Sequence, residues 1–153
     1  MGGEPAIREA ALRIPGGVFV IASAYEGIRA GLIARSAQVC AEEPLLISVA
    51  VRKGHAIEPL IRDSRAFSLF QIEASDKLLT RVFRDSDDTT EPEERHDPFD
   101  SLPVVTLVSD APITTRAVIG FDCEVVRHFD LEADHELYVG LVHAAKVFKT
   151  ESA

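Results

Sequence analysis

Three side chains that can bind an anion gather around one glycine in the segment "VRKGHAIEPLIRDS", residues 51–64. Arg52 and Lys53 end an apolar run, Gly54 follows them, and His55 stands next. Glycine permits a close approach or unusual backbone torsions, and the free amides of a following helix would point toward an incoming anion. The pattern predicts a phosphate site. An ordinary solvated turn between a strand and a helix is the alternative that these residues alone leave open.

Conventional catalytic motifs are missing from the sequence. No serine lies in a GxSxG elbow, and no SxxK, GxGxxG or GxxxxGK[ST] motif occurs. His135 and His143 would share a strand face, but at about 3.3 Å per residue they would lie roughly 25 Å apart, too far for one metal ion. We therefore expect no metal site and no catalytic side chain that acts as an acid, a base or a nucleophile.

The net charge of −9 is unevenly distributed along the chain. Residues 1–80 contain nine basic and nine acidic side chains, whereas residues 85–100 alone contain eight acidic residues against Arg95. This proline-containing, polar segment predicts an acidic surface excursion, where little desolvation is available to raise the pKa of a general acid. No basic stripe suits a nucleic-acid backbone, so we expect no nucleic-acid partner.

The length of 153 residues is typical of a single domain, here residues 1–153. A chain of this size buries about 70% of the surface that its unfolded form exposes, so a substantial core is expected. No apolar run approaches the ~20 residues needed to cross a bilayer, and the N-terminal segment lacks the long apolar stretch of a signal peptide. We expect a soluble cytoplasmic protein with no membrane partner.

Apolar periodicity and turn residues predict mostly short strands. The expected helices are 4–13, 57–62 and 75–85, and the expected strands lie within 16–39 and at 44–51, 66–72, 102–109, 116–129 and 135–148. Alternation places Phe67 and Leu69 on one strand face and the residues between them on the other. Ser75 is the expected N-cap of the third helix. The pattern favours a mainly β fold, a small antiparallel barrel of about six strands with peripheral helices.

Four pieces, read in order, resemble the flavin reductase-like, FMN-binding split-barrel family. They are "IPGGVFVIAS" (14–23), "AGLIARSAQVCAEEPLLISVAV" (30–51), "RKGHAIEPLIRDSRAFSLFQI" (52–72) and "DCEVVRHFDLEADHELYVGLVHAAKV" (122–147). The resemblance covers most of residues 14–148 and rests on the order and spacing of the pieces. It implies a homodimer of six-stranded antiparallel split barrels, with FMN at or near the dimer interface.

The resemblance also implies which residues bind the cofactor. The residues that would border the flavin ring and ribityl chain are Leu32, Ile33, Ala34, Arg35, Ser36 and Gln38, and those near the phosphate are Lys53, Gly54, His55 and Ala56. His135 matches a family histidine on the nicotinamide side of the flavin. Many relatives carry Thr or Ser where this chain has "LIAR" and where it has Ala56 and Ile57. Charge-assisted bonds from Arg35, Lys53 and His55 would replace those hydroxyls. The alternatives are that binding has decayed, or that a different flavin or phosphorylated ligand is held.

A function follows from the resemblance. The protein would bind FMN and accept hydride from NADH or NADPH, after which electrons would pass to a flavin, oxygen, a metal complex or a protein acceptor such as an oxygenase. Because the cofactor performs this chemistry, no catalytic side chain is required. The main alternative is a non-enzymatic FMN-binding electron carrier. A ligand-free interaction domain and pyridoxamine-phosphate-oxidase-like chemistry are two further alternatives.

Overall fold

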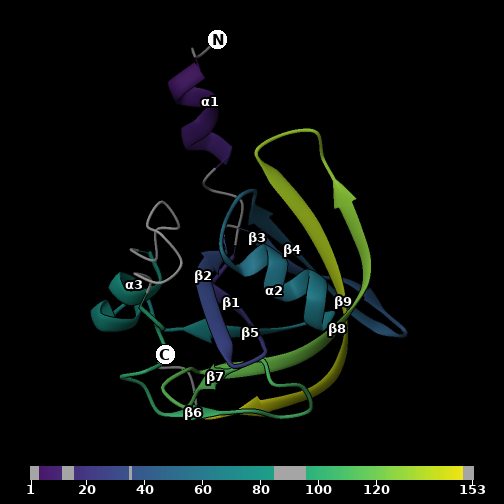
Figure 1. The fold of residues 1–153 in the computed structure, drawn as a ribbon. Helices are drawn as coiled ribbons and strands as arrows, with labels where there is room; N and C mark the ends of the chain where they lie inside the picture. The colour runs from purple at the N-terminus through teal and green to yellow at the C-terminus, as the bar shows by residue number, and fades with distance from the viewer. Residues whose placement is uncertain (1–3, 12–15, 35, 85–95, 150–153) are drawn as a thin grey trace.

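The computed structural model describes residues 4–11, 16–34, 36–84 and 96–149 (Figure 1). Its elements, in chain order, are α1 (Glu4–Ala11), β1 (Val18–Tyr25), β2 (Ile28–Ala34), β3 (Ser36–Glu42), β4 (Leu45–Arg52), α2 (Ile57–Ser64), β5 (Ala66–Ile72), α3 (Lys77–Arg84), β6 (Val104–Val105), β7 (Ile113–Thr114), β8 (Ile119–Asp130) and β9 (His135–Val147). The expected mainly β architecture with short peripheral helices is confirmed.

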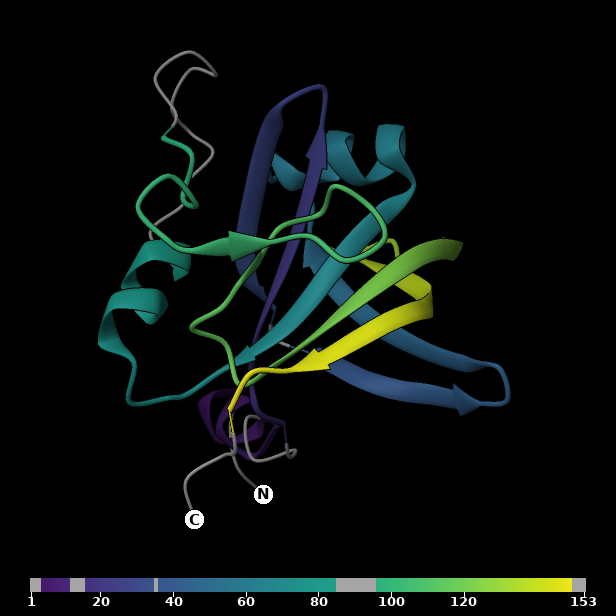
Figure 2. The same cartoon turned by 90° about the horizontal axis from the view of Figure 1, so that it is seen from below.

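Seven strands form one antiparallel sheet in the order β2-β1-β5-β8-β9-β4-β3. The edge strands β2 and β3 are adjacent in sequence, separated only by residue 35, so the sheet curls until its two edges approach each other (Figures 1 and 2). This curvature makes a barrel that stays open between β2 and β3. The two short strands β6 and β7 pair separately.

The strand count and two boundaries differ from the sequence-based expectation. The main sheet has seven strands where six were expected, because the segment read as one hairpin at 16–39 gives three strands that pair with different neighbours. The strand expected at 102–109 shrinks to Val104–Val105. The expected cap Ser75 is also wrong, since the side chain of Asp76 accepts the amide of Leu79 at 3.2 Å.

Alternation along the strands divides the core into two layers. Phe67 and Leu69 of β5 share one face, as expected, and pack inside the barrel against α2, whereas Phe70 and Ile72 pack outside it against α3. Ser68, on the outer face, is fully buried and donates a hydrogen bond to the carbonyl of Pro112 at 2.6 Å. Both faces of the central strands are therefore covered, so these strands form a rigid frame for the loops at the barrel ends.

The helix α2 places the candidate phosphate loop against the barrel. Its buried residues Ile57, Leu60 and Ile61 are spaced by three and four positions and pack on β1 and β2. By contrast, α1 has no buried residue and projects away from the barrel (Figure 1). None of the helices in the described part of the chain combines the length and apolar character needed to span a bilayer.

The acidic segment 85–100 is described only from residue 96 onward. Phe99 in this last part is buried, and its ring lies 5.2 Å from that of Phe83. Arg29 of β2 donates to the carboxylate of Asp97 at 2.7 Å. The end of the expected surface excursion is thus fixed to the barrel by an aromatic contact and an ion pair.

Candidate functional site

The basic turn after β4 lies against the turn that precedes β9. Arg52, the last residue of β4, pairs in register with His135, the first residue of β9. The amide of Lys53 continues this pairing with a 2.9 Å hydrogen bond to the carbonyl of Asp134. Two segments that lie about eighty residues apart in the chain, and that were predicted to contact the phosphate and the nicotinamide, therefore meet at one end of the barrel.

The charged side chains at this meeting point are paired within the chain. The ammonium of Lys53 lies 2.6 Å from Oδ1 of Asp130, and this hydrogen bond raises the pKa of Lys53 and lowers that of Asp130. His135 Nδ1 lies 2.9 Å from Oδ1 of Asp134, whose pKa is lowered by this contact. Both basic groups are partly exposed, so a ligand from solvent can reach them.

The turn from Gly54 to Ala56 carries residues that were predicted to lie near the phosphate, and we call it the anion loop. Gly54 has φ of +86°, and a Cβ placed there would meet no atom within 4 Å, so the space beside it is open. Ala56 caps α2 without a side-chain hydrogen bond. The ring of His55, only 8% exposed, accepts the amide of Ile57 at Nδ1 instead, at 3.0 Å. His55 thus supplies the cap that a Thr or Ser would have given.

Three of the residues predicted to border the flavin ring belong to β2, and their side chains lie on opposite faces of this strand. Leu32 and Ala34 pack toward the inner core layer, whereas Ile33 packs toward the outer layer. A planar ring placed against one face of β2 would contact the side chains of only one of these sets. Ile33 would then contribute only through its backbone.

The strand β3 brings two further predicted residues to the same region. Ser36 pairs with Ala50 and Gln38 with Ser48, so Ser36 lies near the end of β4 that leads into the basic turn. Both side chains are exposed. Arg35, which was also predicted to contact the cofactor, lies outside the described residues.

A cluster of four polar side chains beside the loop was not found from the sequence. Glu58 of α2 accepts the amide of Gly54 at Oε2, at 3.0 Å, and the hydroxyl of Tyr138 at Oε1, at 3.3 Å. The same hydroxyl lies 3.2 Å from Oε2 of Glu136, which also lies 2.9 Å from Nε2 of His128. We call Glu58, Glu136, Tyr138 and His128 the carboxyl cluster.

The two carboxyl groups of this cluster differ in acidity. Burial raises the pKa of Glu58, and its hydrogen bond with Glu136 adds to that shift. The pKa of Glu136 is lowered, chiefly because Glu58 donates that hydrogen bond. When the pair holds a single proton, the proton therefore resides on Glu58. Burial and the two nearby carboxylates raise the pKa of Tyr138, so its hydroxyl remains a donor.

One sequence signal could have indicated the carboxyl cluster in part. Glu136 and Tyr138 are two residues apart on a strand and therefore face the same side, directly after the predicted site residue His135. The sequence could not have indicated that Glu58 contacts these residues, because its contacts depend on how α2 packs against β9. The parallel rings of His128 and Tyr138, 4.5 Å apart, depend likewise on the pairing of β8 with β9.

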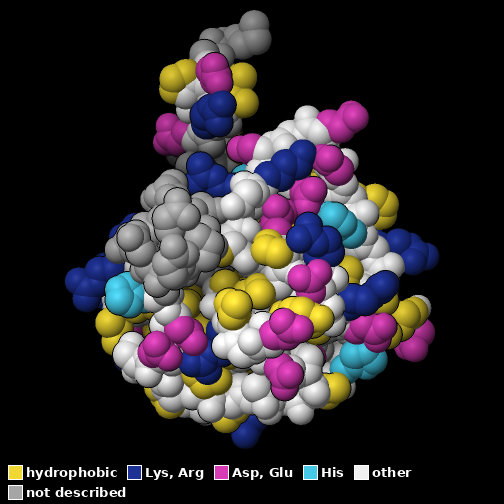
Figure 3. Space-filling model, viewed as in Figure 1, with side chains coloured by type: hydrophobic (Ala, Val, Ile, Leu, Met, Phe, Trp, Pro, Cys, Tyr) yellow, Lys and Arg dark blue, Asp and Glu magenta, His cyan; other side chains and the backbone are white. Residues whose placement is uncertain are grey.

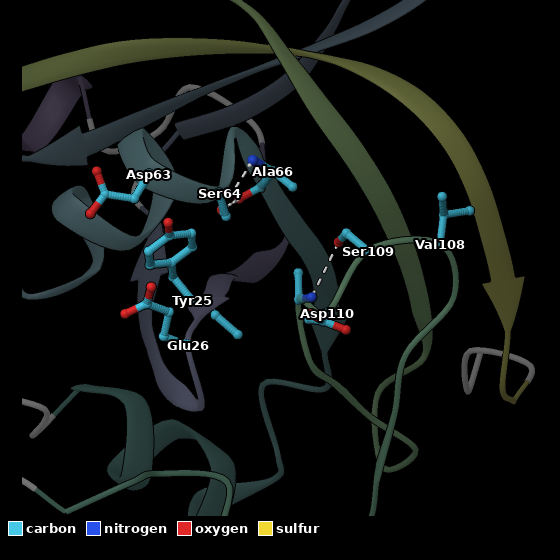
Figure 4. A pocket seen from close by; sticks show the side chains of 10 residues that line it. Tyr25, Glu26, Asp63, Ser64, Ala66, Val108, Ser109 and Asp110 are labelled. Atoms are coloured by element: carbon cyan, nitrogen blue, oxygen red, sulfur yellow. Dashed lines mark hydrogen bonds between the residues drawn. The ribbon is translucent and has the colours of Figure 1, made fainter.

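A cavity of about 390 Å³ lies at the other end of α2. Its lining residues are Ala24, Tyr25, Glu26, Asp63, Ser64, Ala66, Val108, Ser109, Asp110 and Ala111. Figure 4 shows Tyr25, Glu26 and Asp63 on one side and Ser109 and Asp110 on the other. The lining carries three carboxylates and no basic side chain, so it repels a phosphate. None of the predicted site residues lines it.

The surface over α2 and the β8–β9 hairpin is mixed in charge (Figure 3). Acidic side chains lie there among basic side chains and histidine, so this view shows no broad basic patch. Within the described part of the chain, no three His, Cys, Asp or Glu side chains are grouped closely enough to hold a metal ion.

Comparisons with known proteins show which family the chain belongs to. A family model described as "Flavin reductase like domain" matches residues 11–153. The ferric-chelate reductase (NAD(P)H) of Archaeoglobus fulgidus is 27% identical over 145 residues, which cover 92% of this chain and 81% of the relative. A protein named as diflavin flavoprotein A 3 from Nostoc sp. is 27% identical over 149 residues, and the chain spans only 24% of its length.

Solved structures support the fold assignment. The NADH:FAD oxidoreductase SgcE6 of Streptomyces globisporus C-1027 superposes with a TM-score of 0.80 at 23% identity. The superposition covers 96% of this chain and 85% of that protein. At this level of identity, the similarity establishes a shared fold.

Proposed function

The chain belongs to the family of flavin reductase like domains, and we propose that it is an NAD(P)H-dependent flavin oxidoreductase that binds FMN. The observation that carries the proposal is the hydrogen bond between the amide of Lys53 and the carbonyl of Asp134, at 2.9 Å. It holds the anion loop and His135 next to each other, and a reductase must bring a flavin and a nicotinamide together in the same way.

The residues of the basic turn fit the phosphate of FMN. The space beside Gly54 is open, and the ammonium of Lys53 is about one-third exposed, so it can leave Asp130 to contact an added anion. Ammonium-to-phosphate hydrogen bonds are roughly twice as strong as neutral ones. Lys53 and the backbone from Gly54 to Ala56 would therefore hold the phosphate, while His55 keeps the start of α2 in place.

The flavin ring would lie along the ends of β2 and β3. Because Leu32 and Ala34 pack toward the inner core layer, they would contact the ring chiefly through the backbone of β2, and the backbone of Ser36 would offer a further hydrogen bond. His135 would lie on the side from which the nicotinamide approaches. A flavin held there would supply the redox chemistry, taking hydride from the nicotinamide and giving electrons to a free flavin, oxygen or a protein acceptor such as an oxygenase.

A second copy of the chain would complete the site. Large apolar side chains are exposed on two hairpins that project from the barrel (Figures 1 and 2): Val39 and Leu45 at β3–β4, and Phe129 and Leu131 at β8–β9. Burial of such side chains between copies would favour a homodimer. Sedimentation equilibrium of the purified protein tests this, because a monomer at all concentrations would refute the dimer.

A steady-state assay tests the proposed activity. Purified protein would be mixed with NADH or NADPH and with FMN, FAD or riboflavin, and nicotinamide oxidation would be followed by absorbance. We expect oxidation that depends on both protein and flavin. A protein that binds FMN but oxidises neither nicotinamide would instead be an electron carrier, and a protein that binds no flavin would refute the proposal entirely.

A further inference from the structure

The carboxyl group of Glu58 accepts a hydrogen bond from a backbone amide of the anion loop. Its Oε2 atom accepts the amide of Gly54 at 3.0 Å. In the proposed function, the same amide belongs to the backbone that would hold the flavin phosphate. A side chain of the protein thus takes a position on the loop that an anionic ligand would otherwise take.

The position of Glu58 is fixed by several partners. The hydroxyl of Tyr138 donates to its Oε1 atom at 3.3 Å, and the carboxyl of Glu136 shares a hydrogen bond with it. The stacked ring of His128 supports Tyr138 from β8. Because α2, β8 and β9 all contribute, Glu58 is held on the loop by tertiary structure and is more than a flexible surface carboxylate.

The charges that face Glu58 make this contact relevant to an incoming anion. Lys53 lies close enough to interact electrostatically with both Glu58 and Glu136, and it is itself paired with Asp130. A phosphate at the Gly54 amide would therefore meet two carboxyl groups as well as one ammonium. One amide hydrogen cannot be donated fully to two acceptors, so the phosphate and Glu58 compete for it.

We propose that Glu58 is a specificity-determining residue that weakens binding of the flavin phosphate by competing for the Gly54 amide. This inference rests on the proposed flavin site. Its consequence is that FMN loses part of the advantage over riboflavin that its phosphate would otherwise give. Riboflavin, which has no phosphate, is unaffected by the competition.

The raised pKa of Glu58 decides the conditions under which this competition should be tested. A protonated Glu58 is neutral and repels a phosphate less than an ionised one does, so the competition is strongest when Glu58 is ionised. Binding should therefore be measured in mildly alkaline buffer. Under that condition, Glu58→Gln removes the charge and keeps the size of the side chain.

The experiment compares FMN and riboflavin dissociation constants for the wild type and three variants by flavin fluorescence. Glu58→Ala removes the acceptor and should tighten FMN about tenfold, the size expected for one hydrogen bond to a charged group. Glu58→Gln removes the charge but keeps an oxygen that can accept the Gly54 amide, so it should tighten FMN by less, and it covers the case in which the alanine variant does not fold. Asp63→Asn removes the same charge from the same helix at its other end, and it should change neither constant by more than about twofold.

Three outcomes would overturn the inference. Unchanged or weaker FMN binding in both Glu58 variants would show that the carboxyl does not compete with the phosphate. Equal tightening of FMN and riboflavin would show that Glu58 acts elsewhere on the flavin. A wild-type protein that binds neither flavin would refute the proposed function together with this inference, whereas the first two outcomes leave the proposed function intact.

Discussion

The amide of Lys53 donates a 2.9 Å hydrogen bond to the carbonyl of Asp134. This bond extends the ladder between β4 and β9 by one residue beyond the pair formed by Arg52 and His135. It connects the loop that would hold a phosphate to the histidine that would face a nicotinamide. Because it uses only backbone atoms, the connection survives substitution of either side chain, so the two functions can be tested separately.

Removal of the Lys53 ammonium should weaken binding of the flavin phosphate and leave binding of the rest of the flavin nearly unchanged. We expect Lys53→Ala to weaken FMN binding about tenfold, because one charge-assisted hydrogen bond is lost, and to change riboflavin binding less than twofold. Lys149→Ala is the matched control, since Lys149 also pairs with a carboxylate, Glu73 at 2.7 Å, and lies just beyond the opposite end of β9. Flavin fluorescence titration measures both constants. Equal losses for FMN and riboflavin would contradict the phosphate assignment.

Substitution of His135 should affect the nicotinamide step alone. We expect His135→Ala to slow reduction of bound flavin by NAD(P)H on the order of tenfold, the effect of losing about one hydrogen bond to the reacting complex, with flavin affinity within twofold of the wild type. His143→Ala is the control, because His143 lies on the same strand and likewise contacts a carboxylate, Glu124 at 2.7 Å. Rapid-mixing kinetics with each nicotinamide make the measurement. Loss of flavin affinity without a slower reduction would contradict the placement of His135 on the nicotinamide side of the flavin.

A methyl group at Gly140 should destabilise the barrel. A Cβ at this position would lie 2.6 Å from Cβ of Cys123 and 2.6 Å from Cζ of Phe67, closer than packed atoms allow. We expect Gly140→Ala to lower the free energy of unfolding by about 3 kcal/mol. At Gly16 an added Cβ meets nothing within 4 Å, so Gly16→Ala should change the stability by less than about 0.5 kcal/mol. Urea denaturation measures both, and similar stabilities would contradict the packing described here.

The sequence was most informative where local periodicity alone decides the structure. Alternation correctly divided β5, with Phe67 and Leu69 inside the barrel and Phe70 on the outer layer. The basic turn was also found correctly at the end of β4, because an apolar run that stops at Arg52 marks the end of a buried strand. These features depend on the order of neighbouring residues.

Features that depend on distant segments could not be predicted in this way. Phe99 lies in an acidic segment and is nevertheless buried, because Phe70 and Phe83 offer an aromatic surface that the local composition does not reveal. The contact between Glu58 and Tyr138 joins residues eighty positions apart. Such pairs follow from strand register and helix packing, which a single sequence without its fold does not specify.

Anaerobic rapid mixing of the FMN-loaded protein with NADH and with NADPH tests whether the protein reduces its flavin. We expect at least one nicotinamide to bleach the visible absorption of the flavin, at a rate that rises with nicotinamide concentration and then saturates. Saturation would show that the nicotinamide binds beside the flavin before hydride transfer. A flavin spectrum that stays unbleached with both nicotinamides would contradict the claim that this protein is a flavin reductase.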